Sequence, residues 1–379
     1  MRIRAPRIPE NVRIAVIGDV MCDRRFYCRT LGVSPESDSA LKLRFLRGED
    51  TPGGAANVAM NLVSLGVKEV HLYGGIGSDS TGELVYRKLR DAGVTFHYVR
   101  IGETTVKTRI ITEQGHHICR LDHECAVSGG LSSLLGARKL REALSSYAAV
   151  IVSDYAKGMV DDGVLDELRA SSVPFYVDPK RDDVYGYRGA VAITPNEIES
   201  ERLVFSPSLI PSRSRPPLSF KAFIVTAAGK GCMLYTASVD GVIPETVAVY
   251  HHIPAVRRTS GDPTGCGDSF ISGLVVAHLS GLNWVESCLY ANACGALAFD
   301  KVGTAPVSAE EAEREIERHP EAYSAVRDAV YDVQQGVIVW GGPTPLSADA
   351  DRQEAAEAIK DGGEDGRNVE DIEKKENVR

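Results

Sequence analysis

The amino-acid sequence predicts an α/β protein with a three-layer α/β/α fold, a mainly parallel central sheet and a small projecting β-sheet. Short apolar runs alternate with amphipathic segments along the first 230 or so residues. Several of these runs end in a polar residue, as strands do at the ligand-binding edge of a parallel sheet. Two stretches, 22–50 and 95–122, have β-like patterns without an intervening helix. We expect them to form the small sheet, with antiparallel strands, which would serve as a lid.

The strands of the central sheet are expected in the apolar runs. The first run, VRIAVIGD (12–19), is short, apolar and closed by Gly-Asp, which is typical of a buried strand. Five later runs are also expected to be strands, at 69–77, 148–155, 173–180, 190–196 and 223–229. The polar residues at the strand ends are Asp19, Asp154, Asp178 and Asn196. Their side chains should meet at one edge of the sheet.

The helices are expected between these strands. Residues 52–66 combine a glycine turn with an amphipathic helix that ends at Gly66, and 81–94 is a second helix with a stop at Gly93. Residues 160–171 form a third. This alternation predicts a parallel sheet covered on both faces. We expect one domain over 1–342, with a Ser- and Pro-rich surface loop at 205–219, and a charged, disordered tail over 343–379.

Composition excludes several classes of protein. The chain has 379 residues, 43% of them hydrophobic and 25% charged, which is enough for a sizeable core. The net charge of −9 excludes a broad basic surface for nucleic acid. No leader or long apolar run is present, so we expect a cytoplasmic protein without a membrane anchor. The eight cysteines contain no CxxC pair and are expected to be reduced thiols, although a metal or disulfide role stays open.

The segment TSGDPTGCGDSFISG (259–273) carries the most specific chemical pattern. Gly265 and Gly267 bracket Cys266, and Asp268 follows at the start of an apolar, helix-like run. Exposed amides at a helix N-terminus bind anions. A carboxylate beside them could accept a proton, but it could also be an ordinary acidic residue of a first helical turn. The sequence has no P-loop, no GxGxxG after the first strand, and no GxSxG, HExxH or protein-kinase signature.

Four separated motifs resemble the ribokinase-like (PfkB) carbohydrate kinases. They are DPTGCGDSF, similar to the family's DTxGAGD signature, and PGGAANVAMNLVSLG, GGIGSDSTGELVYRKLRDAGV and TPNEIE. Their order and spacing agree with the family over about residues 12–317. The branch that phosphorylates D-glycero-β-D-manno-heptose 7-phosphate, in the ADP-heptose pathway, is the most similar. The segments GDVMCDR, VSDYAKG, VDPKRDDVYGYRGAVAITPN and VGTAPVS carry this finer resemblance.

The resemblance implies a ribokinase-like fold, ATP and Mg²⁺ as cofactors, and a role for each motif. Asp268 would be the general base, and the amides of Gly265, Cys266 and Gly267 would hold the transferring phosphoryl group. Glu199 and Asp262 would contact Mg²⁺ through water. The residues implied at the ATP site are Lys180, Asn196, Glu197, Ile198, Glu199, Thr226, Gly229, Gly231 and Asn292. For Lys180 and Glu199, the alternative is a solvated surface charge.

The sugar site is implied by two further sets of residues. Asp19, Gly53, Gly54 and Asn57 match the hydroxyl-binding set of the family. A sugar phosphate also needs cations, and Lys107, Arg109, Arg120 and Lys157 are the candidates. Lys107 and Arg109 alternate on an expected strand and should point to the same side. The alternative for these cations is a solvated face of the lid.

Departures from the family pattern keep the substrate open. Pro263 and Cys266 alter the DTxGAGD signature, and segment 31–40 lacks the arginine usual in heptose kinases. Another sugar, sugar phosphate or nucleoside is therefore an alternative substrate. A non-catalytic sugar-binding regulator is an alternative of another class. By analogy with the family we also expect a homodimer formed through the lid. Any nucleotidyltransferase activity would come from another chain.

Overall fold

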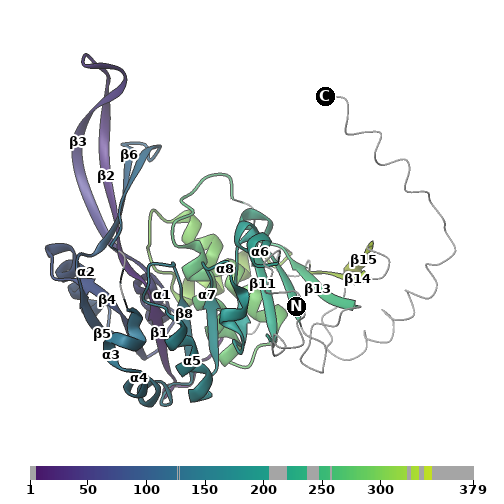
Figure 1. Ribbon diagram of the computed structural model, residues 1–379. Coiled ribbons are helices and arrows are strands. Elements are labelled where there is room, and N and C mark those ends of the chain that lie inside the picture. Colours follow the sequence, from purple (N-terminus) through teal and green to yellow (C-terminus); the bar gives the residue numbers. More distant parts are fainter. Residues whose placement is uncertain are drawn as a thin grey trace.

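The computed structural model describes residues 6–204, 220–236, 247–321, 326–332 and 337–343, apart from Ala126, Ser128 and Arg257. Its central sheet has eleven strands in the order β15-β14-β13-β12-β11-β10-β9-β8-β1-β4-β5 (Figure 1). Their bounds are β1 Arg13–Gly18, β4 Glu69–Gly77, β5 Val94–Ile101, β8 Ala149–Ser153, β9 Phe175–Asp178, β10 Ala192–Ile193, β11 Ala222–Thr226, β12 Cys232–Thr236, β13 Val247–Ile253, β14 Arg327–Asp332 and β15 Val337–Pro343. Pairing is parallel from β5 to β11 and antiparallel from β11 to β15.

Helices cover both faces of this sheet because its central strands are apolar on both sides. In β1, Ile14 and Val16 belong to one hydrophobic core, and Ala15 and Ile17 belong to the other. The first core is covered by α1 Ala55–Ser64, α2 Ser80–Asp91, α7 Cys266–Leu279, α8 Trp284–Asp300 and α9 Ala309–Arg318. The second is covered by α3 Gly130–Leu135, α4 Ala137–Leu144, α5 Asp162–Ser171, the short helix η1 Val184–Tyr187 and α6 Glu197–Val204. The result is the predicted three-layer arrangement.

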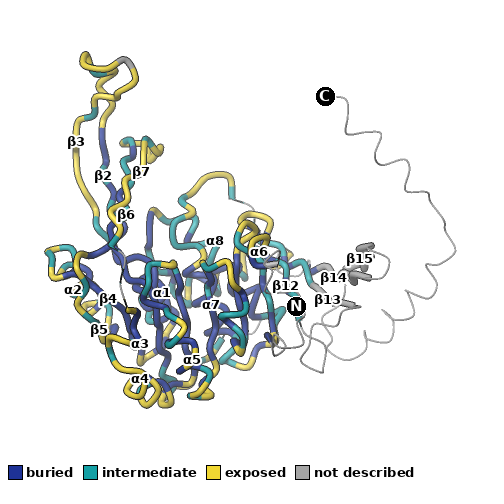
Figure 2. Tube along the Cα trace, in the orientation of Figure 1, coloured by how far each residue is buried: buried dark blue, intermediate teal, exposed yellow. Residues whose placement is uncertain are grey.

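A second sheet, called the small sheet below, projects from the body (Figure 1). It contains β2 Val20–Ser34, β3 Ser37–Gly54, β6 Thr105–Thr112 and β7 His117–His123, in the order β3-β2-β6-β7. The long hairpin of β2 and β3 is buried near the body and exposed toward its tip (Figure 2). Because β2 follows β1 directly and β3 leads directly into α1, the small sheet is anchored beside the carboxyl end of β1.

The fold class predicted from the sequence is confirmed, and the six expected strands and three expected helices are present. Two expectations were wrong. The small sheet is not wholly antiparallel, because β2 pairs in parallel with β6. Segment 95–101 was expected in the small sheet, but β5 pairs in parallel with β4 at the edge of the central sheet. The reason is local: α2 lies between β4 and β5, so the three form a βαβ unit. A half-buried edge strand and a strand of the small sheet have the same alternating pattern, and the sequence did not separate them.

Other elements were not predicted. Helices α3, α4 and α9 and the antiparallel strands β12 to β15 were missed, and β10 is shorter than the expected 190–196. The proposed loop 205–219 and nearly all of the proposed tail 343–379 lie outside the described residues. Within the described part of the chain, no helix is both long and apolar enough to cross a membrane.

Candidate active site

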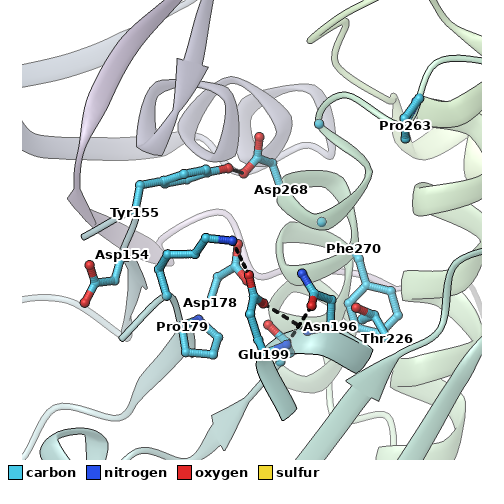
Figure 3. Close-up of a pocket in the computed structure, with 14 residues that line it drawn as sticks. Asp154, Tyr155, Asp178, Pro179, Asn196, Glu199, Thr226, Pro263, Asp268 and Phe270 are labelled. Atoms are coloured by element: carbon cyan, nitrogen blue, oxygen red, sulfur yellow. Dashed lines mark hydrogen bonds and ion pairs between the residues drawn. The ribbon is translucent and has the colours of Figure 1, made fainter. Parts of the chain in front are cut away.

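A cavity of about 200 Å³ opens where the carboxyl ends of the central strands meet the N-terminus of α7 (Figure 3). Most of its lining residues lie at or just after the ends of strands β8, β9, β10 and β11, and the rest belong to α6, to the loop before α7 and to the first turns of α7. They are Asp154, Tyr155, Asp178, Pro179, Lys180, Thr194, Asn196, Glu199, Thr226, Pro263, Gly265, Gly267, Asp268 and Phe270. Ligands bind at this edge of open α/β sheets.

The N-terminus of α7 gives the cavity an anion-binding wall. Gly265 precedes the helix with φ of 81°, a left-handed conformation that favours glycine, and its Cα faces the side-chain amide of Asn57. The amides of a first helical turn lack intrahelical acceptors. The amide of Cys266 makes only a long hydrogen bond of 3.4 Å, to the carbonyl of Pro263. Residues 265–267, called the anion hole below, can therefore offer donors to a phosphoryl group.

Asp268 lies beside this anion hole and is only 3% exposed. Asn57 Nδ2 donates to its Oδ2 at 2.7 Å, and the Tyr155 hydroxyl donates to its Oδ1 at 2.9 Å. Burial raises the pKa of Asp268 to about 6, and these two hydrogen bonds oppose the rise. The carboxylate is thus ionised at neutral pH and yet far more basic than an ordinary aspartate. These properties suit a general base.

Asn196 and Glu199 lie on the wall opposite Asp268 (Figure 3), and Lys180 lines the same cavity. Lys180 Nζ lies 2.6 Å from Glu199 Oε1. Asn196 and Glu199 also bond reciprocally: Glu199 Oε2 accepts from the Asn196 amide, and Asn196 Oδ1 accepts from the Glu199 amide. This is a capping box at the start of α6. The NxxE motif therefore fixes its own carboxylate at the rim of the cavity.

Asp178 adds a further carboxylate between the two walls. Loss of water contact, and then repulsion by the carboxylates of Asp268 and Glu199, raise the pKa of Asp178 well above its ordinary value. A side-chain atom added at Gly267 would lie 4.0 Å from Asp178 Oδ2, so this carboxylate is close to the anion hole. Any phosphate bound here would need positive charge to offset Asp178, Glu199 and Asp268.

The four predicted sugar-phosphate cations gather around the inner face of the small sheet, but three are paired. Arg109 contacts Asp23 at 2.5 Å, Lys157 contacts Glu124 at 2.7 Å, and Arg120 makes two hydrogen bonds with Asp122. Lys107 Nζ instead lies 4.6 Å from the centre of the Tyr155 ring. Partial burial, more than any other influence, lowers the pKa of Lys107. Among the described residues, Lys107 has no carboxylate within ion-pair distance.

Several predicted site residues have structural partners instead of lining the cavity. The Asp19 carboxylate is 2% exposed and accepts from the amides of Tyr155, Lys157 and Met159, so it anchors the loop after β8. Asn57 lies against Asp268. Gly53 and Gly54 end β3, where they pair with Met21 and Val20. Direct contact of these residues with a sugar remains a prediction.

The same holds for part of the predicted ATP and metal set. Glu197 pairs with Lys230, and Ile198 is 65% exposed; neither lines the cavity. Asn292 donates to the carbonyls of Ile253 and Pro254. Gly229 and Gly231 lie at the turn between β11 and β12, and Gly231 also approaches Ile253. Asp262 Oδ1 accepts hydrogen bonds from the amide and hydroxyl of Thr264, and Asp262 Oδ2 accepts from the amide of Gly303.

The sequence did not assign roles to Tyr155, Asp178 or Asp23. The signal for Asp178 was its position at a strand end. Tyr155 follows another strand-end residue, Asp154, within the characteristic DYAKG segment. Asp23 had no comparable signal, because its role depends on the pairing of β2 with β6.

A three-layer α/β/α protein with a buried carboxylate beside an anion hole defines a class: a phosphotransferase with an alcohol group as acceptor. Comparison with known proteins gives the family. Residues 11–312 match the pfkB family carbohydrate kinases. The chain belongs to this family of sugar kinases, whose phosphoryl donor is ATP.

Individual relatives agree with this assignment. The chain is 35% identical to the bifunctional protein HldE of Shewanella amazonensis over 318 residues, which cover 81% of the chain and 64% of that protein. It is 34% identical to HldE of Haemophilus influenzae over 323 residues, covering 82% and 65%. The chain thus spans slightly less than two thirds of the length of these relatives.

Solved structures share the fold. A ribokinase from Thermotoga maritima superimposes with a TM-score of 0.61 at 19% identity, covering 81% of the chain and 99% of that protein. Phosphofructokinase-2 from Escherichia coli, solved in complex with potassium, gives a TM-score of 0.62 at 17% identity, covering 81% and 98%. The ribokinase-like fold predicted from the sequence is confirmed.

Proposed function

We propose that this sugar kinase phosphorylates the anomeric hydroxyl of D-glycero-D-manno-heptose 7-phosphate to give the 1,7-bisphosphate. The observation that carries the catalytic part of the proposal is the placement of Asp268. Asp268 is buried, its pKa is about 6, and it lies beside the anion hole. It accepts a hydrogen bond from Tyr155, whose ring contacts Lys107 of the small sheet. The sequence resemblance to heptose 7-phosphate kinases supports the choice of sugar.

In the proposed step, Asp268 accepts the proton of the anomeric hydroxyl as that oxygen attacks the γ-phosphorus of ATP. The bond between the γ-phosphorus and the bridging oxygen breaks, and ADP leaves with the electron pair. Asp268 ends the step as a neutral acid. The amides of residues 265–267 offset the charge on the transferring group. Asn57 and Tyr155 hold the carboxylate in place and keep its pKa from rising further.

The donor set fits Mg²⁺ held jointly by protein and nucleotide. Asp178 and Glu199 supply carboxylate oxygens at the cavity, and Lys180 supplies a cation for phosphate. Among the described residues, no group of three or more His, Cys, Asp or Glu side chains could hold a metal ion by itself. Mg²⁺ typically uses one or two carboxylates together with substrate phosphates. When bound, the ion would neutralise phosphate charge; Asp262 remains a candidate for contact through water.

The small sheet is the proposed site of the sugar's own phosphate. Lys107 is half-buried beside the Tyr155 ring and has no ion-pair partner within the described residues, so it is the first candidate. Arg109 and Lys157 are nearby but would have to share their carboxylate partners with the substrate. Four cations face the three carboxylates of Asp23, Asp122 and Glu124, which leaves an excess of one positive charge.

A second candidate is a kinase for another sugar or sugar phosphate. The altered segment 31–40 lies at the turn of the β2–β3 hairpin, where Leu31 and Val33 are exposed. The same tip carries exposed Leu41, Phe45 and Leu46. We propose that this apolar tip supports the predicted homodimer.

We also propose that residues 1–342 form one kinase domain, that the protein is cytoplasmic, and that a separate nucleotidyltransferase acts in the same pathway.

The test is a panel of sugars assayed with ATP and Mg²⁺ for ADP release. It should contain heptose 7-phosphate, hexose 6-phosphates and the corresponding neutral sugars, with and without EDTA. We expect the highest kcat/KM with heptose 7-phosphate, and no turnover in EDTA. Higher kcat/KM for a neutral sugar would overturn the proposed substrate. ADP release that persists in Asp268→Asn would overturn the proposed base.

A further inference from the structure

Arg25 belongs to strand β2 of the small sheet but is buried against the body. Only 2% of its side chain is exposed, and it is the largest of the fully buried side chains in the described part of the chain. An arginine is seldom buried to this extent unless its charge is paired. Its surroundings therefore show what the guanidinium does.

The guanidinium contacts two loops of the body that are distant in sequence. Its Nη2 lies 3.6 Å from Asp262 Oδ2, in the loop before α7. It also packs directly on Gly303, which has φ of 81° and where any side chain would overlap the guanidinium. Nη2 is buried and has no hydrogen-bond partner in the structure. An approach of about half an ångström would bring it within hydrogen-bond distance of Asp262.

Asp262 in turn organises the anion hole. Its Oδ1 accepts from the amide and hydroxyl of Thr264, the residue immediately before Gly265. Its Oδ2 accepts from the amide of Gly303 at 2.9 Å. The loop that presents residues 265–267 is thus held by one carboxylate, and the cation facing that carboxylate comes from the small sheet.

We propose that Arg25 is a positioning residue that couples the small sheet to the anion hole. Through Asp262, it positions the loop whose amides receive the phosphoryl group. Nη2, which is ion-paired with Asp262 but has no hydrogen-bond partner, completes a hydrogen bond to Asp262 when the small sheet approaches the body. Arg25 contacts neither substrate. The inference rests on the proposed catalytic step but not on the identity of the sugar.

The test compares Arg25→Met with Arg24→Met. Arg24 is the adjacent arginine on β2 and makes two hydrogen bonds with Asp50, away from Asp262. With whichever sugar the panel identifies, we expect Arg25→Met to lower kcat by about 10- to 100-fold, because small displacements of catalytic groups have effects of this size. KM for ATP should change by less than about threefold. Arg25→Lys should recover part of kcat, and Arg24→Met should keep kcat within about twofold.

A double-mutant cycle with Asp262→Asn tests the route of the effect. If Arg25 acts through Asp262, the double variant should have no lower kcat than the worse single variant. Additive losses would overturn the proposal, as would a wild-type kcat in Arg25→Met or an equal loss in Arg24→Met.

Amide hydrogen exchange gives a readout that needs no substrate. Arg25→Met, but not Arg24→Met, should exchange faster at residues 262–268. Unchanged exchange there would contradict the coupling even if no sugar were turned over, whereas failure of the proposed function alone would leave this result intact. If Arg25→Met does not fold, Arg25→Lys and Asp262→Asn provide the same comparison.

Discussion

Replacing Asp268 by asparagine should make the protein less active and, at neutral pH, more stable. The substitution keeps the shape of the side chain, and its carbonyl oxygen can still accept from Asn57 or Tyr155. It removes the negative charge that the fold buries. Activity should fall by about 10²–10⁴-fold because the general base is lost. A gain in stability at an active-site position is the less obvious half of this prediction.

The magnitude of the stability change follows from the pKa of Asp268. A rise from 3.8 to about 6 on folding corresponds to roughly 3 kcal/mol. The folded protein holds the proton more tightly, so this contribution to stability is present below pH 3.8 and is lost as the pH rises through about 6. Asparagine cannot ionise, so the free energy of unfolding of Asp268→Asn, relative to wild type, should increase by about 2 to 3 kcal/mol between pH 4 and pH 8, because part of the unfolded-state carboxyl is already ionised at pH 4.

The assay is chemical denaturation of both proteins at several pH values between 4 and 8, with kcat measured on the same preparations. Comparing pH values cancels any constant penalty from the mismatched amide. Asp79→Asn is the matched control: burial opposes ionisation there, but hydrogen bonds from Thr104 and Gly82 outweigh it and lower the pKa of Asp79. That variant should lose stability at pH 8, relative to wild type, and keep its activity.

The reasoning fails if the stability difference between Asp268→Asn and wild type is the same at pH 4 and pH 8. In that case the carboxylate is not held in the charged state against a desolvation penalty. It also fails if Asp268→Asn keeps kcat within tenfold of wild type, because the proton must then go elsewhere.

Three further variants test individual contacts. Tyr155→Phe removes a hydrogen bond that lowers the pKa of Asp268, so the acid limb of the pH profile of kcat/KM should move to higher pH. An acid limb at the wild-type pH would show that this hydrogen bond does not influence the base. Lys107→Met should raise KM for a phosphorylated sugar by about 10-fold or more and leave KM for a neutral sugar nearly unchanged, as steady-state kinetics would show. Ala156→Gly should raise the free energy of unfolding by about 0.5–1 kcal/mol, because Ala156 has φ of 54°; thermal or urea unfolding that shows no gain would mean that the loop relaxes around alanine.

The sequence predicted the parts of the site that lie within single motifs. The anion hole and Asp268 occupy four consecutive residues, and the Asn196–Glu199 capping box spans four. Both depend on short-range geometry at a helix N-terminus, which residue spacing records directly. The strand-end positions of Asp154 and Asp178 were visible for a similar reason, because the apolar runs that precede them set the sheet edge.

Contacts between distant segments were not predictable in the same way. Asn57 and Asp268 are 211 positions apart, and their hydrogen bond requires α1 to pack on α7. The pairing of Arg109 with Asp23 depends on the register between β2 and β6, which the alternating pattern does not determine. The sequence pattern does not distinguish Arg25 from the other charged residues of a half-exposed strand. Its burial follows from where the whole small sheet meets the body.

The position of Lys107 links substrate binding to the strength of the base. Burial is the main reason that the pKa of Asp268 is high, and the positive charge of Lys107 is among the influences that lower it. A sugar phosphate bound to Lys107 would offset that positive charge. Asp268 would then hold a proton more tightly in the complex than in the free enzyme. The carboxylate would become a stronger base only once the correct substrate is present, whereas a neutral sugar would leave its basicity unchanged. The same lysine would thus contribute to recognition and to selectivity in the chemical step.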